Sequence, residues 1–197
     1  EIRKKMDNTP SPEFKELARK AELFGLYKNT QLQEAHRKIL ASANRDKRLL
    51  NTKEINTLCE KSHCNPEKLE ELQRRLPQLI NEAKEALIRK IPDITKPGGS
   101  LYPKERAEAC WRDCFHLARI CIYGTAAGNT NITDKQGLQA VQELYKILKV
   151  PIDALTLCLK ELQENCKEIY SESNESTDLK LLDGCFNHLV EKMESIK

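Results

Sequence analysis

The sequence predicts an all-α fold, and three observations lead to this prediction. Apolar residues recur at spacings of three and four along most of the 197 residues, which is the period of an amphipathic helix. Residues that begin and end helices stand between these stripes, and no segment alternates apolar and polar residues as a strand does. No apolar run approaches the roughly 20 residues of a membrane-spanning helix. We therefore expect packed helices around an interior core.

The apolar stripes and the helix-terminating residues together divide the chain into eight expected helices. They cover residues 12–26, 30–42, 51–59, 65–87, 104–127, about 138–148, 152–170 and 178–197.

Capping patterns support the helices of the first half. Asn51 is followed three residues later by Glu54, the pattern of a capping box, in which each side chain bonds the other residue's backbone. Asn65 before Pro66 is a second start signal, because Asn caps orphan N–H groups and Pro lacks one. Pro77 falls inside that helix and should kink it or split it in two.

Proline and glycine define the middle of the chain. Residues 91–103 contain three prolines and two glycines and cannot form a regular helix. The next helix ends at Gly128, Pro151 ends the one after it, and the polar segment SESNEST separates the last two. Five of the seven glycines lie between Gly98 and Gly137, where tight turns and close backbone approach are possible. We expect a ligand in this middle third.

Charge divides the chain into two parts. Residues 1–50 hold 12 Lys and Arg against 7 Asp and Glu, whereas the other 147 residues hold 21 against 23. We therefore expect a basic N-terminal helical extension, residues 1–45, and a domain of residues 46–197. In the extension, acids interleave with bases and no aromatic series is available for stacking bases, which favours a solvated helix over a nucleic-acid-binding arm.

The eight cysteines do not have the spacing of a disulfide framework or a zinc ribbon. The closest pairs are Cys59 with Cys64 and Cys110 with Cys114, and neither is joined by a second motif. We expect most of them to be small apolar core residues, with no metal site.

The first ten residues are charged and lack the apolar stretch of a signal peptide. These features predict a soluble protein of a reducing compartment.

One stretch carries a specific pattern. Pro97-Gly98-Gly99 stands before Tyr102, Cys110 is followed by Arg112-Asp113, and Arg119, Tyr123, Ala127-Gly128, Tyr145 and Val150-Pro151 continue in register. In this gap-free register the segment resembles the phycobiliproteins, allophycocyanin-type subunits in particular. The resemblance implies a globin-like phycobiliprotein fold preceded by the N-terminal extension, and more weakly it runs from about Leu49 to the C-terminus.

The resemblance also implies a ligand and residues that hold it. The ligand is phycocyanobilin or a related linear tetrapyrrole, with Cys110 as a thioether anchor. Asp113 would accept hydrogen bonds from the pyrrole nitrogens, and Arg112 and Arg106 would pair the propionates, because guanidinium groups bind carboxylates bidentately. Tyr123 and the loop containing Ser100 would wall the pocket; Ser100 stands where many family members have Asn.

The function that follows from the resemblance is non-catalytic bilin binding, either in phycobilisome light harvesting or in handling or sensing a bilin for tetrapyrrole metabolism. The basic extension departs from the family and favours the handling role. The expected partners are the bilin and a phycobilisome or tetrapyrrole-biosynthesis protein, or a second copy of the chain, with no nucleic acid and no membrane span. The expected location is the cyanobacterial cytoplasm, including the thylakoid surface, or the chloroplast stroma.

Two other functions stay open on the sequence. One is a pigment-free interaction module of the same fold that regulates a partner through its N-terminal extension. The other is a haem-binding globin, for which the available imidazoles are His36, His63, His116 and His188. An enzyme has no support, since no nucleophile–base pair, phosphate-binding glycine loop or metal-ligand set is present.

Overall fold

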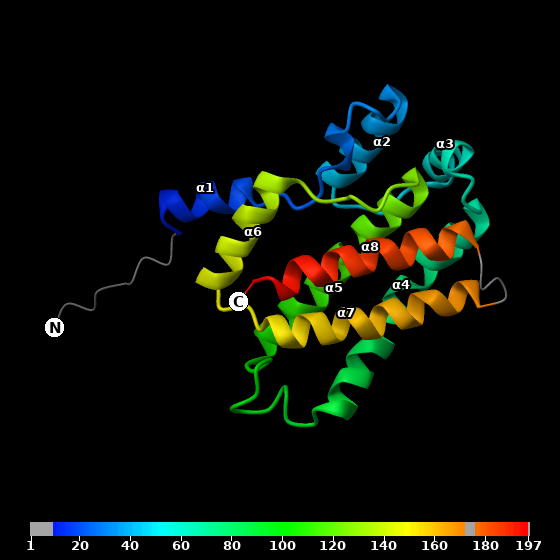
Figure 1. Cartoon of the computed structure of the whole chain (residues 1–197). Coiled ribbons are helices and arrows are strands. Elements are labelled where there is room, and N and C mark those ends of the chain that lie inside the picture. Colours follow the sequence, from blue (N-terminus) through cyan, green and yellow to red (C-terminus); the bar gives the residue numbers. More distant parts are fainter. Residues whose placement is uncertain (1–9, 172–175, 197) are drawn as a thin grey trace.

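The computed structural model describes residues 10–171 and 176–196 and confirms the all-α prediction (Figure 1). Within these residues no β-strand forms, and the only extended pairing is an isolated bridge between Phe24 and Thr133. The helices are α1 (Pro12–Lys20), η1 (Leu26–Lys28), α2 (Glu34–Arg45), α3 (Thr52–Ser62), α4 (Pro66–Lys90), α5 (Lys104–Ala127), α6 (Lys135–Ile147), α7 (Ile152–Lys167), η2 (Glu168–Tyr170) and α8 (Thr177–Glu194).

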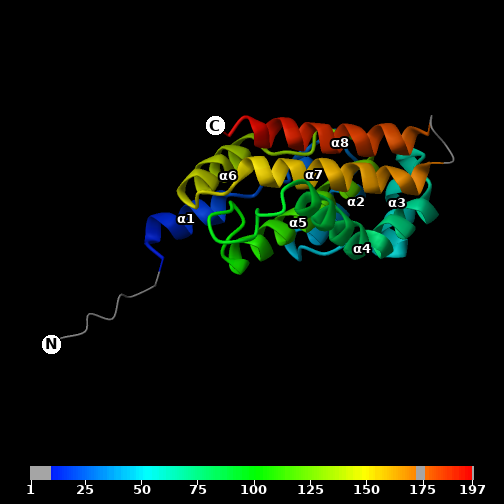
Figure 2. The same ribbon diagram turned by 90° about the horizontal axis from the view of Figure 1, so that it is seen from below.

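Helix α5 is the centre of the molecule. It packs against α3, α4, α7 and α8, and more than half of its residues are buried. Helices α7 and α8 run antiparallel side by side and form one layer over it (Figures 1 and 2). Gly128 ends α5 in the left-handed conformation, φ 74°, which glycine adopts without strain, as the sequence predicts. Within the described residues, no helix is long and apolar enough to cross a membrane.

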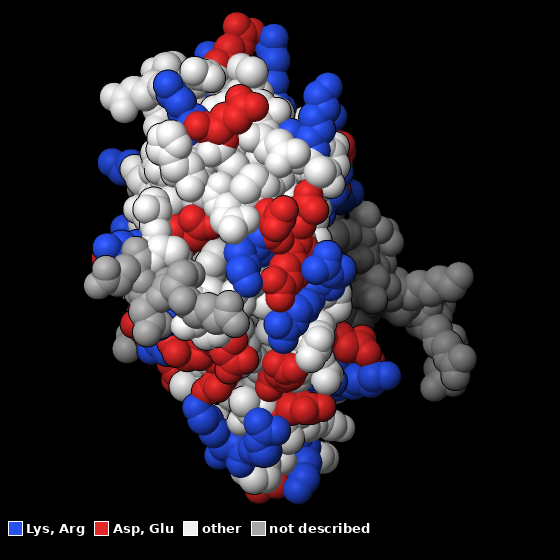
Figure 3. Space-filling view, turned by 90° about the vertical axis from the view of Figure 1, so that its right-hand side faces the viewer, with Lys and Arg blue, Asp and Glu red and all other residues white. Residues whose placement is uncertain are grey.

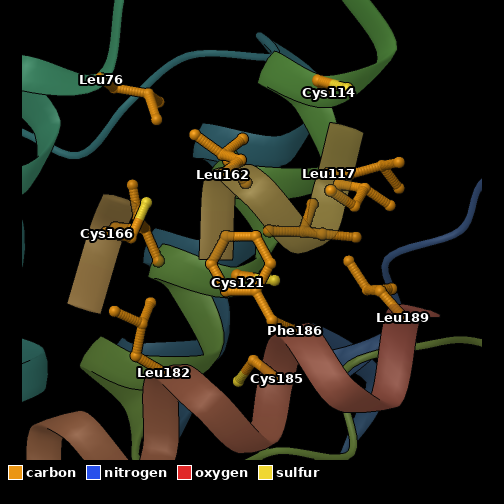
Figure 4. Close-up of a cluster of buried hydrophobic side chains, with 14 of the residues drawn as sticks. Leu76, Cys114, Leu117, Cys121, Leu162, Cys166, Leu182, Cys185, Phe186 and Leu189 are labelled. Atoms are coloured by element: carbon orange, nitrogen blue, oxygen red, sulfur yellow. The ribbon is translucent and has the colours of Figure 1, made fainter. Parts of the chain in front are cut away.

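The core is built from leucine, cysteine and phenylalanine side chains that meet between α4, α5, α7 and α8 (Figure 4). All eight cysteines are buried and none forms a disulfide, so the prediction that they are apolar core residues is confirmed. The side chains labelled in Figure 4 are Leu76, Cys114, Leu117, Cys121, Leu162, Cys166, Leu182, Cys185, Phe186 and Leu189.

Helix α4 decides one part of the expectation for Pro77, that it would kink the helix or split it. It runs from Pro66 to Lys90 without a break, so Pro77 does not split it into two helices. The stripe of buried residues keeps the same helical phase on both sides of the proline, from Leu69 and Leu76 to Leu79 and Leu87. Burying that stripe against one core outweighs the roughly 3 kcal/mol that proline costs inside a helix.

The N-terminal segment differs from the helix expected over residues 12–26. Helix α1 ends at Lys20 rather than continuing to residue 26, and the chain then becomes extended. Phe24 is buried because its ring packs edge-on against Tyr123, with ring centroids 5.3 Å apart, and not because it lies on a helical stripe. Residues 12–28, which we call the strap, contact α6 through α1 and then run beside the segment that precedes α6 (Figure 1).

Backbone and ionic contacts fasten the strap to the segment before α6. The Gly25 amide donates to the Ile132 carbonyl at 2.9 Å, and the Asp134 amide donates to the Leu23 carbonyl at 2.8 Å. Lys28 pairs with Asp134 at 3.2 Å. Helix α2 contributes Leu40 and Ala43 to the core. The division between residues 1–45 and 46–197 therefore stays a prediction, and residues 1–9 of the extension lie outside the described residues.

Surface charge is mixed on the face that Figure 3 shows, where Lys and Arg lie among Asp and Glu. Several surface pairs are one helical turn apart, such as Glu34 with Lys38 at 2.8 Å and Glu16 with Arg19 at 2.7 Å.

Candidate functional site

Helix α5 brings three of the predicted ligand residues together. Arg106, Cys110 and Asp113 are spaced by four and three residues, so they share one face of the helix. They line a cleft of about 50 Å³, closed on its other side by Val150, Pro151 and Leu155. The cleft therefore places a thiol, a carboxylate and a guanidinium in one small space.

Asp113 is the central group of this arrangement. Burial raises the pKa of its carboxyl, while the nearby charge of Arg112 and a hydrogen bond from the Tyr145 hydroxyl act in the opposite direction. The Tyr145 bond is long, at 3.5 Å, and no ion pair to Asp113 forms within the described part of the chain. Asp113 also lines a second, larger cavity of about 480 Å³, so it belongs to the wall between the two spaces.

The two predicted propionate partners differ in their surroundings. Arg112 is exposed, and its charge favours the ionised form of Asp113. Arg106 is half-buried, and its Nη1 donates to the Lys149 carbonyl at 2.6 Å. Lys149 has a φ of 51°, a left-handed conformation that non-glycine residues rarely adopt. Arg106 is thus fixed at the edge of the cleft.

Ser100 and Tyr123 are not brought to this cleft. Ser100 is exposed and lines a separate cavity of about 420 Å³ with Gly98, Gly99 and Leu157. Tyr123 is fully buried; its hydroxyl donates to the Arg48 carbonyl and accepts from Arg119 Nη1 at 3.0 Å. Neither residue walls the space around Cys110 as the resemblance implied, because Ser100 faces solvent and Tyr123 joins α5 to the segment before α3.

The surroundings of His116 do not suit a haem ligand. Metal-ligating His normally donates its second ring N–H to an acceptor. In His116, Nδ1 instead accepts a hydrogen bond from Arg119 Nε at 3.2 Å, and in His188, Nε2 lies 2.8 Å from the Thr133 hydroxyl. Within the described residues, no group of three or more His, Cys, Asp and Glu could hold a metal ion.

The thiols near the cleft form a buried cluster. Hydrogen bonds with Cys110 and Cys158, together with burial, raise the pKa of the Cys114 thiol well above its ordinary value. Burial also raises the pKa of Cys121. Cys114 and Cys121 are therefore thiols rather than thiolates at neutral pH.

Sequence reasoning missed the residues that make the larger cavity. Tyr145 stands opposite Asp113, and Arg119, Asn44 and Lys47 line the same space from α5 and from the end of α2. The one signal available was Arg119, a charged residue in the most apolar part of its helix. Asn44 and Lys47 lie about 75 residues earlier, and nothing in their local pattern connects them to it.

Asp113→Asn is expected to stabilise the ligand-free chain and weaken ligand binding. The substitution removes a half-buried carboxylate that forms no ion pair within the described residues, so the free energy of unfolding should rise by about 0.5–2 kcal/mol. Thermal unfolding at neutral pH measures this change, with Asp93→Asn, an exposed residue in a surface ion pair, as the control. A lower melting temperature for Asp113→Asn would contradict it.

Acidification is expected to destabilise the chain as the pH falls through about 6.5. Burial lowers the pKa of both His116 and His188 below the ordinary value of 6.5. The unfolded state therefore binds more protons than the folded state in this window, and stability is lost as the pH falls. Melting temperatures at pH 7.5, 6.5 and 5.5 test this. Replacing both histidines with Gln should flatten the dependence, and an unchanged slope would count against the assignment.

Comparison with known proteins identifies the family of the chain and several relatives. A family model described as "Phycobilisome protein" matches residues 38–193, which include all the residues that line the cleft. The allophycocyanin alpha subunit of Picosynechococcus sp. is 36% identical over 86 residues, which cover 44% of this chain and 53% of that protein. The allophycocyanin alpha chain of Synechocystis sp. is 31% identical over 115 residues, 58% and 69% of the two chains.

The chain thus spans between about half and two thirds of the length of these relatives. Among solved structures, a far-red fluorescent biliprotein derived from an allophycocyanin F subunit of Chroococcidiopsis thermalis matches with a TM-score of 0.57. The match has 19% sequence identity and covers 68% of this chain and 96% of that one. This likeness confirms the predicted globin-like fold.

Proposed function

The chain belongs to the phycobilisome protein family, and from this membership we propose that it is a non-catalytic protein that binds a bilin. The observation that carries the proposal is the cleft in which Cys110 and Asp113 share one face of α5. A thiol can form a thioether with the vinyl or ethylidene group of a linear tetrapyrrole. A carboxylate three residues along the helix can accept hydrogen bonds from the pyrrole N–H groups.

The residues present suit such a ligand. Asp113 is a half-buried carboxylate whose hydrogen bond from Tyr145 is long, so it has capacity for further donors. The adjoining cavity of about 480 Å³ lies within the range of about 300–1,000 Å³ usual for ligand pockets. When bound, phycocyanobilin or a related bilin would supply absorption of visible light. Cys110 would hold it, and Arg106 and Arg112 would bind its propionates.

We propose that the protein handles or senses a bilin rather than serving as an ordinary antenna subunit. Support comes from the strap, which packs on α6 of its own chain, and from the basic character of the N-terminal region. A phycobilisome or tetrapyrrole-biosynthesis protein, or a second copy of the chain, would be the partner. The cytoplasm of a cyanobacterium, including the thylakoid surface, or the chloroplast stroma would be the location.

A second candidate function is a pigment-free interaction module. The observation that favours it is the small volume of the cleft beside Cys110, about 50 Å³, which by itself holds no tetrapyrrole. Bilin binding requires that this cleft and the larger cavity join around Asp113. If the chain binds no bilin and its function survives the loss of Cys110 but not of the strap, this second function is the correct one.

Production of the full chain in cells that also make phycocyanobilin tests the proposal. We expect the purified protein to absorb red light and to keep the pigment after denaturation, seen as zinc-enhanced fluorescence on a gel. Pigment that is present in the native protein and lost on denaturation would indicate a reversible carrier. A colourless chain that also fails to bind added bilin would exclude the bilin-binding function.

A further inference from the structure

The larger cavity lies beneath the strap. It is bounded by residues 18–24 of the strap, by the end of α2, and by the faces of α5 and α6 that look toward them. Asp113 stands at one part of its wall and Arg119 at another, six residues further along α5, or about 9 Å along the helix axis. A ligand that reaches Asp113 therefore has access to a second polar region.

Arg119 is a buried cation without an anionic partner. It is only 5% exposed, and its Nε donates to His116 while Nη1 donates to Asn44 Oδ1 at 3.1 Å and to the Tyr123 hydroxyl at 3.0 Å. All three partners are neutral, and no carboxylate lies within 4.0 Å of Arg119 in the described residues. Within the same residues Nη2 makes no hydrogen bond. A buried charge normally has a counterion, because desolvation is costly.

Lys47 adds a second uncompensated cation to this region. It lines the cavity next to Asn44, is exposed, and forms no ion pair within the described part of the chain. Burial lowers the pKa of His116, and the charges of Arg119, Lys47 and Arg112 act in the same direction, so these cations lie near the same imidazole. The other basic residues of the lining are neutralised, Arg19 by Glu16 at 2.7 Å and Arg45 by Asp46 at 3.2 Å.

The acidic residues of the cavity lining do not pair with Arg119 or Lys47. Glu22 accepts hydrogen bonds from the Tyr27 hydroxyl and from Asn44 Nδ2, both at 2.9 Å, and lies behind Asn44 as seen from Arg119. Asp113 is on the opposite side of the lining, against Tyr145. The lining thus holds the carboxylates of Glu22 and Asp113 as well as the cations Arg119 and Lys47, and within the described residues neither carboxylate forms an ion pair with either cation.

We propose that Arg119 and Lys47 form a carboxylate-binding subsite beneath the strap. The inference rests on the proposed function and specifies it: the ligand is an acidic tetrapyrrole, and one of its propionates binds Arg119 Nη2 and Lys47 Nζ while its pyrrole nitrogens face Asp113. The strap covers this end of the ligand. Arg112 and Arg106, the partners that the resemblance implied, are then left for the other propionate.

Biliverdin and its dimethyl ester provide the test, because they differ only at the two propionates, which are charged in the acid and neutral methyl esters in the other compound. Binding is titrated by absorbance on the full chain carrying Cys110→Ala, which keeps binding reversible. We expect the acid to bind about tenfold or more tightly than the ester, since charge-assisted hydrogen bonds to carboxylates are lost in the ester. The preference should decrease with added salt.

Two variants test whether Lys47 and Arg119 cause the preference for the acid over the ester. Lys47→Asn removes the charge and suits the φ of 49° at this position, because Asn tolerates the left-handed conformation. We expect it to reduce the preference for the acid at least threefold, and Arg119→Gln to reduce it further, with circular dichroism as the check that the variant folds. Arg45→Gln, on the same lining but paired with Asp46, is the matched control and should leave the preference unchanged.

The outcomes distinguish failure of the carboxylate-binding subsite from failure of bilin binding. Equal binding of acid and ester overturns the subsite and leaves bilin binding intact. A preference that persists in Lys47→Asn and Arg119→Gln also overturns it, because the propionates then bind elsewhere. Binding of neither compound overturns the proposed function and the subsite together.

Discussion

Cys110→Ala is expected to abolish covalent bilin attachment to the chain completely. Cys110 is the one cysteine that lines the cleft shared with Asp113, whereas Cys114 and Cys158 lie behind it in the core. Without the sulfur no thioether can form, even where the rest of the pocket still binds pigment. Zinc-enhanced fluorescence of the denatured protein, after production with a phycocyanobilin-producing pathway, should fall to background.

Cys114→Ala is the matched control for this experiment. Cys114 lies one helical turn after Cys110, is fully buried and hydrogen-bonds the Cys110 thiol, so the substitution disturbs the same part of α5 without touching the cleft lining. The variant should keep the fluorescent band. A band that survives in Cys110→Ala would assign attachment to a different residue and would remove the main argument for the site.

Gly137→Ala is expected to detach the strap from α6. A Cβ atom at this position would lie 1.7 Å from the Glu22 carbonyl oxygen, and that neighbour is backbone rather than a flexible side chain. The strap must therefore move or the chain must distort, at a cost of about 1–3 kcal/mol typical of overpacking. The Leu23–Asp134 and Gly25–Ile132 hydrogen bonds should weaken with it.

Limited trypsin digestion measures this change. Cleavage within residues 12–28 should become several-fold faster in Gly137→Ala, while the helices of the core remain resistant. Gln136→Ala, an exposed neighbour in the first turn of α6, is the control and should match the wild type. Unchanged cleavage in Gly137→Ala would show that the strap does not depend on close packing over this glycine.

Most helices could be predicted from the sequence because local interactions determine where they begin and end. The capping box of Asn51 and Glu54 forms as predicted, with the two reciprocal hydrogen bonds at 2.9 and 3.0 Å. Asn65 also caps α4, accepting from the Glu67 amide at 3.0 Å. Pro77 left open whether α4 is kinked or split, because the local cost of proline does not include the tertiary burial on both sides of it that keeps the helix continuous.

The strap could not be predicted because its contacts are distant in sequence. The apolar residues between Phe14 and Leu26 fit a helical spacing, yet Phe24 is held by a residue about 100 positions later and by backbone bonds to residues 132–134. The sequence contained only an indirect sign, a glycine in the first turn of α6. Glycine is a poor helix former, so its presence there indicates close approach of another backbone.

The candidate site was predictable only where spacing along one helix brings its residues together. Arg106, Cys110 and Asp113 lie on one helix face, and helical spacing alone brings them together. Ser100 and Tyr123 depend on how a loop and a helix face pack, which spacing does not determine. Lys47 and Asn44 reach the cavity through the packing of α2 on α5, which has no local signature in the sequence.

Burial of the cysteines has a chemical consequence for selectivity. The fold acts as a protecting group: it encloses the other sulfurs in core packing, and within the described cavities it offers an incoming electrophile the sulfur of Cys110 alone. An unfolded chain would present eight sulfurs of similar intrinsic reactivity. Regioselective modification is therefore a property of the folded state, and loading of the chain has to follow its folding. Burial also raises the pKa of five of the other thiols that the fold encloses: Cys59, Cys64, Cys121, Cys166 and Cys185.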